Sequence, residues 1–263
     1  TWSVGVTSTD ALRIWTQSNF GEDLIFAARG GNLFFWDATD ALTTRGVLLS
    51  SESGASNVPA IVNTVLVSDN RFVFCFGTNV LGSTDIDPML LRWSDQENAV
   101  NWTPSATNQA GDLRLSKGSE IITAIQGRQE ILVWTDSALY ALQYVGAPAV
   151  WSSQTVGENL SIASPSTVAY ANGVAYWMGV GGFYRYDGRV QTLPCTLKRY
   201  IFNDFNTEQY DQVFAGTNEG FSEVWWYYCS SSATAIDRYV IYNYEQNIWY
   251  YGNLARTAWI DSG

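Results

Sequence analysis

Short runs of alternating apolar and polar residues, separated by tight polar turns, recur along the chain. The clearest run, at Glu130–Gly146, predicts a strand at Ile131–Trp134, a turn at Thr135–Ala138 and a return strand at Leu139–Val145. A period of two, β-branched and aromatic residues and a short polar turn are typical of a β-hairpin. The same pattern returns in four other segments: Asp23–Asp37, Arg71–Asp95, Gly173–Gly188 and Glu223–Tyr244.

Each hairpin lies between two further expected strands. The preceding strands are Leu12–Thr16, Ala60–Val67, Glu120–Ile125, Ser166–Tyr170 and Gln212–Ala215, the last of them followed by a turn at Gly216–Gly220. The following strands are Gly46–Ser50, Val100–Thr103, Val150–Val156, Val190–Leu193 and Asn247–Gly252. The pattern predicts units of four antiparallel strands, and only Thr39–Thr43 and Thr196–Phe205 allow a short helical turn.

The spacing of these units favours a β-propeller. Equivalent positions on the third strand are 57, 49, 44 and 56 residues apart, at Trp36, Trp93, Leu142, Tyr186 and Tyr242. Four-stranded propeller blades repeat about every 40–50 residues, which leaves room for loop insertions. We therefore expect an all-β, β-propeller-like fold of five to six four-stranded antiparallel blades, forming a single domain over residues 1–263. A two-sheet sandwich is the competing architecture.

The two ends of the chain predict an incomplete sixth blade. Thr1–Val6 would supply its outer strand and Ala255–Ile260 its inner strand, because propellers often close their ring with strands from distant parts of the chain. The first residue is Thr1 rather than Met, and the sequence stops shortly after an expected strand. We accordingly expect the chain to be part of a longer polypeptide.

Composition narrows the chemistry that the chain can perform. Aromatic residues make up 15% of the sequence, as expected for a packed β protein, and there is no His. The absence of His disfavours triad hydrolases and zinc enzymes, because His is their commonest general base and metal ligand. Cys75, Cys195 and Cys229 are far apart and odd in number, which favours free thiols in a protein assembled in a reducing compartment.

The charge of the chain disfavours nucleic acid and membranes as tightly bound partners. With a formal net charge of −11, the surface would on average repel a phosphate backbone. Lys198 and Arg199 are the only strictly adjacent basic pair, and no basic stripe with interleaved aromatic residues is present. No apolar run approaches the ~18 residues that a membrane-spanning helix needs.

Acidic residues provide the strongest candidates for a chemical site, and each has a simpler explanation. Asp85 and Asp87 offer two carboxylates to a hard cation, but they lack the ligand ladder and the Gly of a calcium loop. Asp204, Glu208 and Asp211 cluster between the fourth and fifth units, where a solvated connection is expected. These residues favour exposed loops over a metal site.

Two other motifs are candidates for a functional site. Ser8-Thr9-Asp10 followed by Trp15 resembles the aspartate box of sialidase-like propellers, although Leu12 stands where that motif has Gly. Gly179–Gly182 lies between two expected strands rather than before a helix, which indicates a turn and not a phosphate-binding loop.

Two aromatic runs, Trp225–Tyr228 and Trp249–Tyr251, would suit ligand platforms. Neighbouring strand residues face opposite sides, however, so burial between blades explains both faces at once. From the residues alone we expect no enzymatic activity, no catalytic residues, no cofactor and no metal. A carbohydrate-binding or glycoside-cleaving propeller remains the alternative function, and a protein-binding module is a further rival class.

The segment Leu90–Leu115, LLRWSDQENAVNWTPSATNQAGDLRL, resembles virion proteins of short-tailed bacteriophages. The family is that of the tail nozzle or tail tubular proteins, including the packaged-DNA stabilisation proteins. Its most specific parts are Arg92-Trp93-Ser94-Asp95, Asn101-Trp102-Thr103-Pro104 and Asn108-Gln109-Ala110-Gly111. The similarity extends from about Leu90 to the C-terminus, whereas the first ~90 residues match only as propeller repeats.

The resemblance implies a structural role in the virion. Proteins of this family carry a β-propeller and form a sixfold ring beneath the portal and its adaptor, and DNA passes along the ring axis. It implies a homo-oligomer in the phage tail, assembled in the host cytoplasm, with adaptor, portal and other tail proteins as partners and DNA as weakly interacting cargo. The chain is shorter than the proteins of this family, which usually add a second, tube-forming β domain, and we therefore expect a fragment of a longer nozzle protein. The family has no catalytic residues to carry over. The alternative function, a carbohydrate-binding or glycoside-cleaving propeller, would belong to a phage tail or to a secreted protein.

Overall fold

Twenty strands form five antiparallel sheets of four strands each in the computed structural model, which describes residues 12–260. Blade 1 holds β1 (Trp15–Phe20), β2 (Asp23–Ala28), β3 (Leu33–Trp36) and β4 (Val47–Leu48). Blade 2 holds β5 (Val62–Val67), β6 (Val73–Asn79), β7 (Ile86–Trp93) and β8 (Gly111–Arg114). Blade 3 holds β9 (Ile121–Gln126), β10 (Ile131–Thr135), β11 (Ala138–Gly146) and β12 (Val150–Glu158).

The last two sheets complete the arrangement. Blade 4 holds β13 (Val168–Ala171), β14 (Val174–Met178), β15 (Phe183–Tyr186) and β16 (Val190–Leu193). Blade 5 holds β17 (Phe214–Asn218), β18 (Glu223–Tyr228), β19 (Arg238–Asn243) and β20 (Ile248–Asn253). Helical segments are short: η1 (Leu49–Ser51), α1 (Lys198–Asn203), η2 (Thr207–Gln212) and η3 (Glu219–Phe221).

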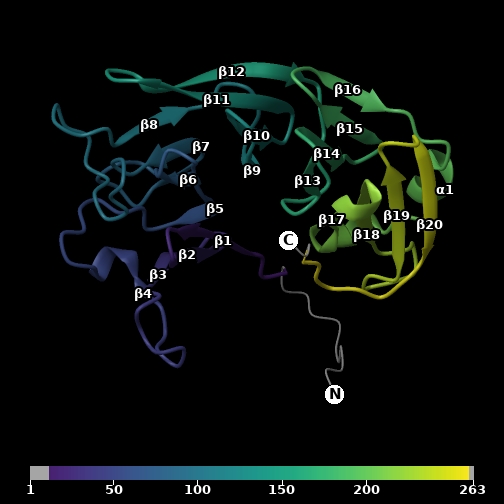
Figure 1. Cartoon of the computed structure of the whole chain (residues 1–263), viewed down its shortest axis with the longest axis horizontal. Coiled ribbons are helices and arrows are strands. Elements are labelled where there is room, and N and C mark those ends of the chain that lie inside the picture. The colour runs from purple at the N-terminus through teal and green to yellow at the C-terminus, as the bar shows by residue number, and fades with distance from the viewer. Residues whose placement is uncertain (1–11, 261–263) are drawn as a thin grey trace.

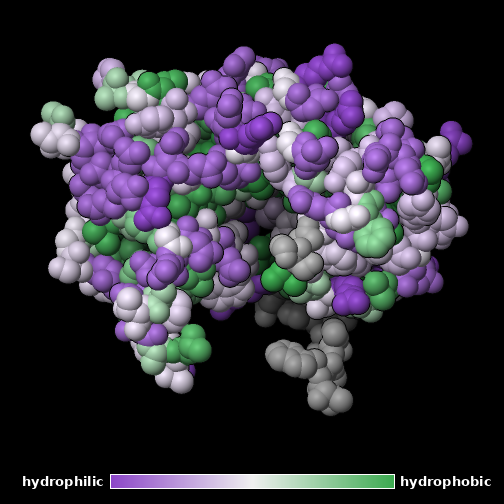
Figure 2. Space-filling view, viewed as in Figure 1, coloured by the Kyte–Doolittle hydropathy of each residue, from purple (hydrophilic) through white to green (hydrophobic). Residues whose placement is uncertain are grey.

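The sheets stand around a common axis as the blades of a β-propeller, which confirms the predicted fold class. In Figure 1 the first strand of each blade lies nearest the axis and the fourth lies at the outside. Hydrophilic residues dominate the face seen in Figure 2, and apolar residues gather between the blades. The residues that the sequence made equivalent all lie on the third strand of their blades. Trp93 differs in orientation, because it packs toward the next blade, whereas Leu142, Tyr186 and Tyr242 pack toward the preceding one.

Neighbouring blades cover each other's sheet faces, so blades 2, 3 and 4 are buried on both faces. On β18, Val224, Trp226 and Tyr228 pack toward blade 4, whereas Trp225 and Tyr227 lie on the opposite face. Four apolar clusters join blades 1 and 2, 2 and 3, 3 and 4, and 4 and 5 in this way. Aromatic runs in the sequence are consequently split between two interfaces, as the two-sided packing hypothesis predicted.

The predicted first strands of blades 1 and 5 begin too early in the sequence. The first strand of blade 1 is Trp15–Phe20 rather than Leu12–Thr16, because the chain turns only at Gly21, whose φ of 72° suits glycine. The first strand of blade 5 is Phe214–Asn218 rather than Gln212–Ala215, so the turn predicted to begin at Gly216 starts later. Thr39–Thr43 forms turns without a helix, whereas the helix within Thr196–Phe205 is present.

The fourth strand of blade 2 is β8 (Gly111–Arg114), not Val100–Thr103 as predicted. Trp102 is 1% exposed and points into the cluster between blades 1 and 2. Its backbone N–H donates to the carbonyl of Ser56 at 3.0 Å instead of pairing with β7. The segment therefore ties blade 2 to the connection that follows blade 1.

The predicted inner strand of a sixth blade, Ala255–Ile260, is not a strand. Its Trp259 instead covers the free face of blade 5, with its ring 5.6 Å from that of Trp225 and its Nε1–H donating to the carbonyl of Thr217 at 2.9 Å. Gly216 leaves the room that this indole occupies. The other predicted strand of that blade, Thr1–Val6, lies outside the described residues.

The three cysteines are free. Cys75 and Cys229 are fully buried, and Cys195 is partly exposed. Burial raises the pKa of all three thiols, to about 11 for Cys195 and Cys229, so they persist as neutral thiols at neutral pH.

Gly111 provides a test of how tightly blade 2 is packed. A Cβ at this position would lie 2.5 Å from Cζ2 of Trp93, whose indole is fixed by a 2.7 Å hydrogen bond to the carbonyl of Gln109. We expect Gly111→Ala to lower the free energy of unfolding by about 1–3 kcal/mol, measured by urea denaturation. Gly220→Ala, where a Cβ meets nothing within 4 Å, is the matched control and should stay within about 0.5 kcal/mol. Equal effects of the two variants would contradict the packing argument.

Candidate functional site

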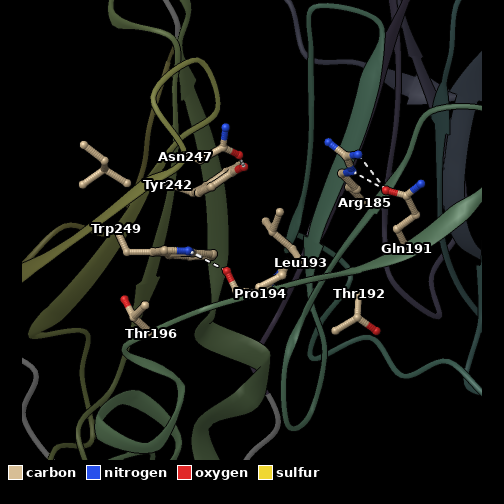
Figure 3. Close-up of a pocket in the computed structure, with 10 residues that line it drawn as sticks. Arg185, Gln191, Thr192, Leu193, Pro194, Thr196, Tyr242, Asn247 and Trp249 are labelled. Carbon is tan, nitrogen blue, oxygen red and sulfur yellow. Dashed lines mark hydrogen bonds between the residues drawn. The ribbon is translucent and has the colours of Figure 1, made fainter.

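A groove with a volume of about 660 Å³ opens between the outer strands of blades 4 and 5. This volume lies within the ~300–1,000 Å³ typical of ligand pockets. In Figure 3, β15 and β16 supply one wall, β19 and β20 supply the other, and Leu193 and Pro194 lie between them. We call this feature the blade 4/5 groove.

Arg185 and Gln191 form the blade 4 wall. They are direct cross-strand partners on β15 and β16, so both side chains project from the same face of the sheet. Arg185 donates through Nε at 2.9 Å and through Nη2 at 2.6 Å to the single amide oxygen of Gln191. Nη2 also lies 3.6 Å from Oδ2 of Asp187, and the arginine side chain is about one-third exposed. The wall therefore holds a guanidinium fixed in orientation but still open to solvent.

Tyr242, Asn247 and Trp249 form the blade 5 wall. The hydroxyl of Tyr242 donates to Oδ1 of Asn247 at 2.6 Å, and burial raises the pKa of this tyrosine. Trp249 donates from Nε1 to the carbonyl of Pro194 at 2.9 Å, and its ring packs 4.8 Å from the ring of Tyr242. These contacts hold the aromatic wall against the core between the blades.

The lining of the blade 4/5 groove suits binding rather than bond cleavage. Its ten residues include no Asp, Glu or Cys, and hence no carboxylate or thiol for acid–base or nucleophilic work. They include one cation, two amides and two threonine hydroxyls above an apolar floor. A few polar groups around an apolar surface are typical of a recognition site.

Two smaller hollows, of about 450 and 150 Å³, lie on either side of the turn between β9 and β10. Both are lined by Arg128, Gln129 and Glu130, which this turn carries. Glu130 and Asp187 line the larger hollow together with Arg128, so it has mixed charge.

The predicted acidic pair at Asp85 and Asp87 is split between two roles. Asp87 accepts from Nε of Arg114 at 2.5 Å and from the backbone N–H of Met89 at 2.9 Å. Asp85 is exposed in the loop between β6 and β7. The structure therefore explains Asp87 as part of a surface ion pair.

Asp204, Glu208 and Asp211 also have separate surroundings. Ser231 donates to Asp204 at 2.8 Å and Arg238 lies 3.5 Å away, and together they hold the pKa of this carboxyl below its usual range. Asp211 lies near Arg29 of blade 1, whose pKa is lowered by burial and raised in part by that carboxylate. Within residues 12–260, no group of three or more His, Cys, Asp or Glu side chains could hold a metal ion.

The structure also shows the surroundings of three other segments that the sequence offered as candidate sites. Gly179–Gly182 is the turn between β14 and β15, closed by a 2.8 Å bond from the N–H of Gly179 to the carbonyl of Gly182. Trp15 lies on β1 and is 53% exposed, whereas Ser8-Thr9-Asp10 lies outside the described residues. In the run Trp249–Tyr251, only Trp249 reaches the groove, and the two tyrosines are exposed.

The segment that carries the phage resemblance builds a buried clamp in blade 2. Arg92 is 2% exposed, and its guanidinium donates to the backbone carbonyls of Asn57, Asn79 and Trp102 at 2.7, 3.4 and 3.5 Å. Ser56 donates from its hydroxyl to Oδ1 of Asn101 at 3.0 Å. These bonds join blade 2 to the connection that follows blade 1.

Two further side chains close the same clamp. Asp95 accepts from the backbone N–H of Gln109 at 2.9 Å, and Asn108 donates to the carbonyl of Thr103 at 2.7 Å. The motif thus fixes a long loop by side chain to backbone bonds. Its residues are explained by folding, and none of them lines the blade 4/5 groove.

Sequence reasoning missed the residues of the blade 4/5 groove. Arg185 and Gln191 lie in separate strands, and only the hairpin register brings them together. The sequence feature that could have predicted this pairing is the turn at Asp187–Arg189, because a hairpin with this turn places Arg185 opposite Gln191. Asn247 and Trp249 belong to blade 5, so they reach this groove only because blades 4 and 5 pack side by side.

Comparisons with known proteins bear on the fold. No family model and no curated protein matches the chain. Among solved structures, an ancestral GH74 enzyme is similar over 91% of this chain and 34% of its own, at 11% identity and a TM-score of 0.53. BamB from Moraxella catarrhalis is similar over 90% and 60%, at 15% identity and a TM-score of 0.48. The extracellular domain of BT4673 from B. thetaiotaomicron is similar over 80% and 25%, at 15% identity and a TM-score of 0.49.

The five sheets define a β-propeller, and the similarity to the GH74 enzyme concerns this fold alone. The chain spans about a quarter of the length of the BT4673 domain and about a third of that of the GH74 enzyme. Identities this low show a shared architecture only. Among the described residues, no helix has the length and hydropathy to cross a membrane.

Arg92 provides a test of the clamp. We expect Arg92→Met to lower the free energy of unfolding by about 2–4 kcal/mol, because it leaves buried carbonyls without donors. Arg114→Met removes an arginine that is 60% exposed in its pair with Asp87, and should cost at most about 1 kcal/mol. Urea denaturation of both variants measures the difference. A cost for Arg92→Met no larger than that of the control would contradict a folding role for the motif.

Proposed function

We propose that this chain is a non-catalytic β-propeller component of a bacteriophage tail, acting through assembly with other proteins. The sequence resemblance over Leu90–Leu115 motivates the tail assignment. The solved structures described above contribute the propeller fold and nothing more specific. The tail location, the sixfold ring and the adaptor and portal partners all belong to this proposal.

One observation carries the assembly role: the outward face of blade 1. In the other blades, sheet faces that point toward a neighbour are packed against it. On blade 1, Trp15, Phe26, Phe34 and Leu48 share the face that points away from blade 2, and the first of them is 53% exposed. Exposed apolar surface of this kind marks sites of contact between proteins. We call this surface the blade 1 face.

A non-catalytic role agrees with the chemistry of the grooves. Glycoside cleavage needs two carboxyl groups about 5–9.5 Å apart around the substrate. The blade 4/5 groove is lined by none, which disfavours hydrolysis there. Carbohydrate binding is therefore the second candidate function, and the exposed guanidinium, the amides and the aromatic wall of this groove favour it.

Imaging tests the assembly role. We expect negative-stain micrographs of the purified protein to show ring-shaped oligomers, and mass spectrometry of purified virions to detect the chain. Trp15→Glu places a charge in the blade 1 face and should disperse the rings, since desolvating an unpaired charge in an interface is costly. Tyr250→Glu, at an exposed tyrosine on β20, is the control and should leave them intact. A monomer in all samples, with no copy in virions, would exclude the assembly role.

DNA is expected to be cargo that does not adhere. Each phosphate contact made by Lys or Arg adds a counterion-release contribution to the affinity, and a net charge of −11 opposes such contacts. We expect a mobility-shift assay at low salt to show little or no binding of duplex DNA by the protein. Micromolar binding that weakens steeply with added salt would contradict the passive-conduit hypothesis and indicate a basic surface that binds DNA.

A further inference from the structure

We propose that the blade 4/5 groove binds a carboxylate-bearing saccharide, with Arg185 as the group that pairs with the carboxylate. The inference deepens the second candidate function, carbohydrate binding, and rests on it. It does not depend on the tail assignment. Its basis is the hydrogen-bonding state of the groove residues.

The polar groups of the groove are predominantly donors, because the oxygens of both amides already accept hydrogen bonds from protein groups. Gln191 accepts two bonds from Arg185 through its only oxygen, and Asn247 accepts from the hydroxyl of Tyr242 through its own. An amide whose oxygen is occupied presents its NH₂ group to a ligand. Opposite walls therefore offer N–H groups from Arg185, Gln191 and Asn247, and such a set is complementary to an acceptor-rich ligand.

The single cation limits the charge of that ligand. Arg185 is the only Lys or Arg in the lining, and Asp187 lies 3.6 Å from its Nη2. A phosphate would bring up to two negative charges on a single group against one partly compensated guanidinium. A carboxylate brings one charge and matches the planar fork of arginine. The site thus fits a monoanionic group.

The rest of the lining favours a sugar over an acidic peptide. Thr192 and Thr196 add hydroxyl groups along the apolar floor of Leu193 and Pro194, and Trp249 closes one side of the groove. Sugar hydroxyls can accept from the amide N–H groups and donate to the threonine hydroxyls, while C–H faces pack on the apolar floor. A uronic acid combines these hydroxyls with one carboxylate.

Calorimetry with trigalacturonate tests the inference, with galactotriose as the neutral counterpart and triglutamate as the acidic peptide. We expect the protein at low salt to bind trigalacturonate more tightly than either of the other two. Asn247→Asp keeps an acceptor for Tyr242 but replaces the NH₂ donor by a negative charge. This variant should weaken trigalacturonate binding about ten- to hundredfold, the worth of one charge-assisted hydrogen bond.

Gln191→Glu should have a similar effect, because the new carboxylate would neutralise Arg185. The matched control is Gln154→Glu, which makes the same change of charge at an exposed position on β12, and should alter affinity less than twofold. Thermal denaturation checks that each variant is folded. Equal affinity of all variants for trigalacturonate would overturn the assignment to this groove.

The other outcomes separate the inference from the function on which it rests. Galactotriose binding as tightly as trigalacturonate would overturn the acidic-saccharide inference and leave carbohydrate binding standing. Triglutamate binding as tightly would assign the groove to acidic peptides instead. Absence of binding by both saccharides at millimolar concentration would overturn the inference and the second candidate function together.

Discussion

Burial of sheet faces between neighbouring blades is the constraint on which this structure depends. A four-stranded sheet cannot bury its own faces, so each blade derives its stability from the blade before it and the blade after it. The chain meets this requirement with large side chains: Trp134, Trp177 and Trp226 are each at most 1% exposed in the interfaces between blades. Each such side chain contributes about 1.5–3 kcal/mol when it leaves water. A blade at the end of the series has one face without a neighbour.

The two end blades meet that problem differently. Blade 5 covers its free face with the indole of Trp259, for which Gly216 leaves space. On blade 1, Trp15 remains largely exposed on the equivalent side. Because of this difference, exposed apolar surface lies on blade 1. The interface that we propose lies on this blade, whereas the polar groove lies between the outer strands of blades 4 and 5.

The sequence was sufficient for the architecture because the two-residue alternation and the repeat of four strands are local properties. It predicted Val190–Leu193 as a strand to the residue, and it explained Trp225–Tyr228 as a run divided between two faces. It was wrong at Val100–Thr103, where a β-like pattern belongs to a loop. There the side chain of Trp102 is drawn into the interface with blade 1, a tertiary contact that no local pattern encodes.

The candidate site lay beyond sequence reasoning for a related reason. In the sequence, Arg185 and Gln191 are ordinary polar residues of two strands. Their role emerges only when these strands pair, because two hydrogen bonds from the guanidinium then occupy the amide oxygen and leave the amide N–H groups facing outward. Asn247 reaches the same state through Tyr242, on a different blade. A protein with a net charge of −11 would not be expected to attract anions. The hydrogen-bond donors of a groove can nevertheless favour an anion that the total charge of the protein repels. Direct contacts at about 3 Å are little screened by salt, whereas repulsion between exposed charges fades beyond a screening length of ~10 Å.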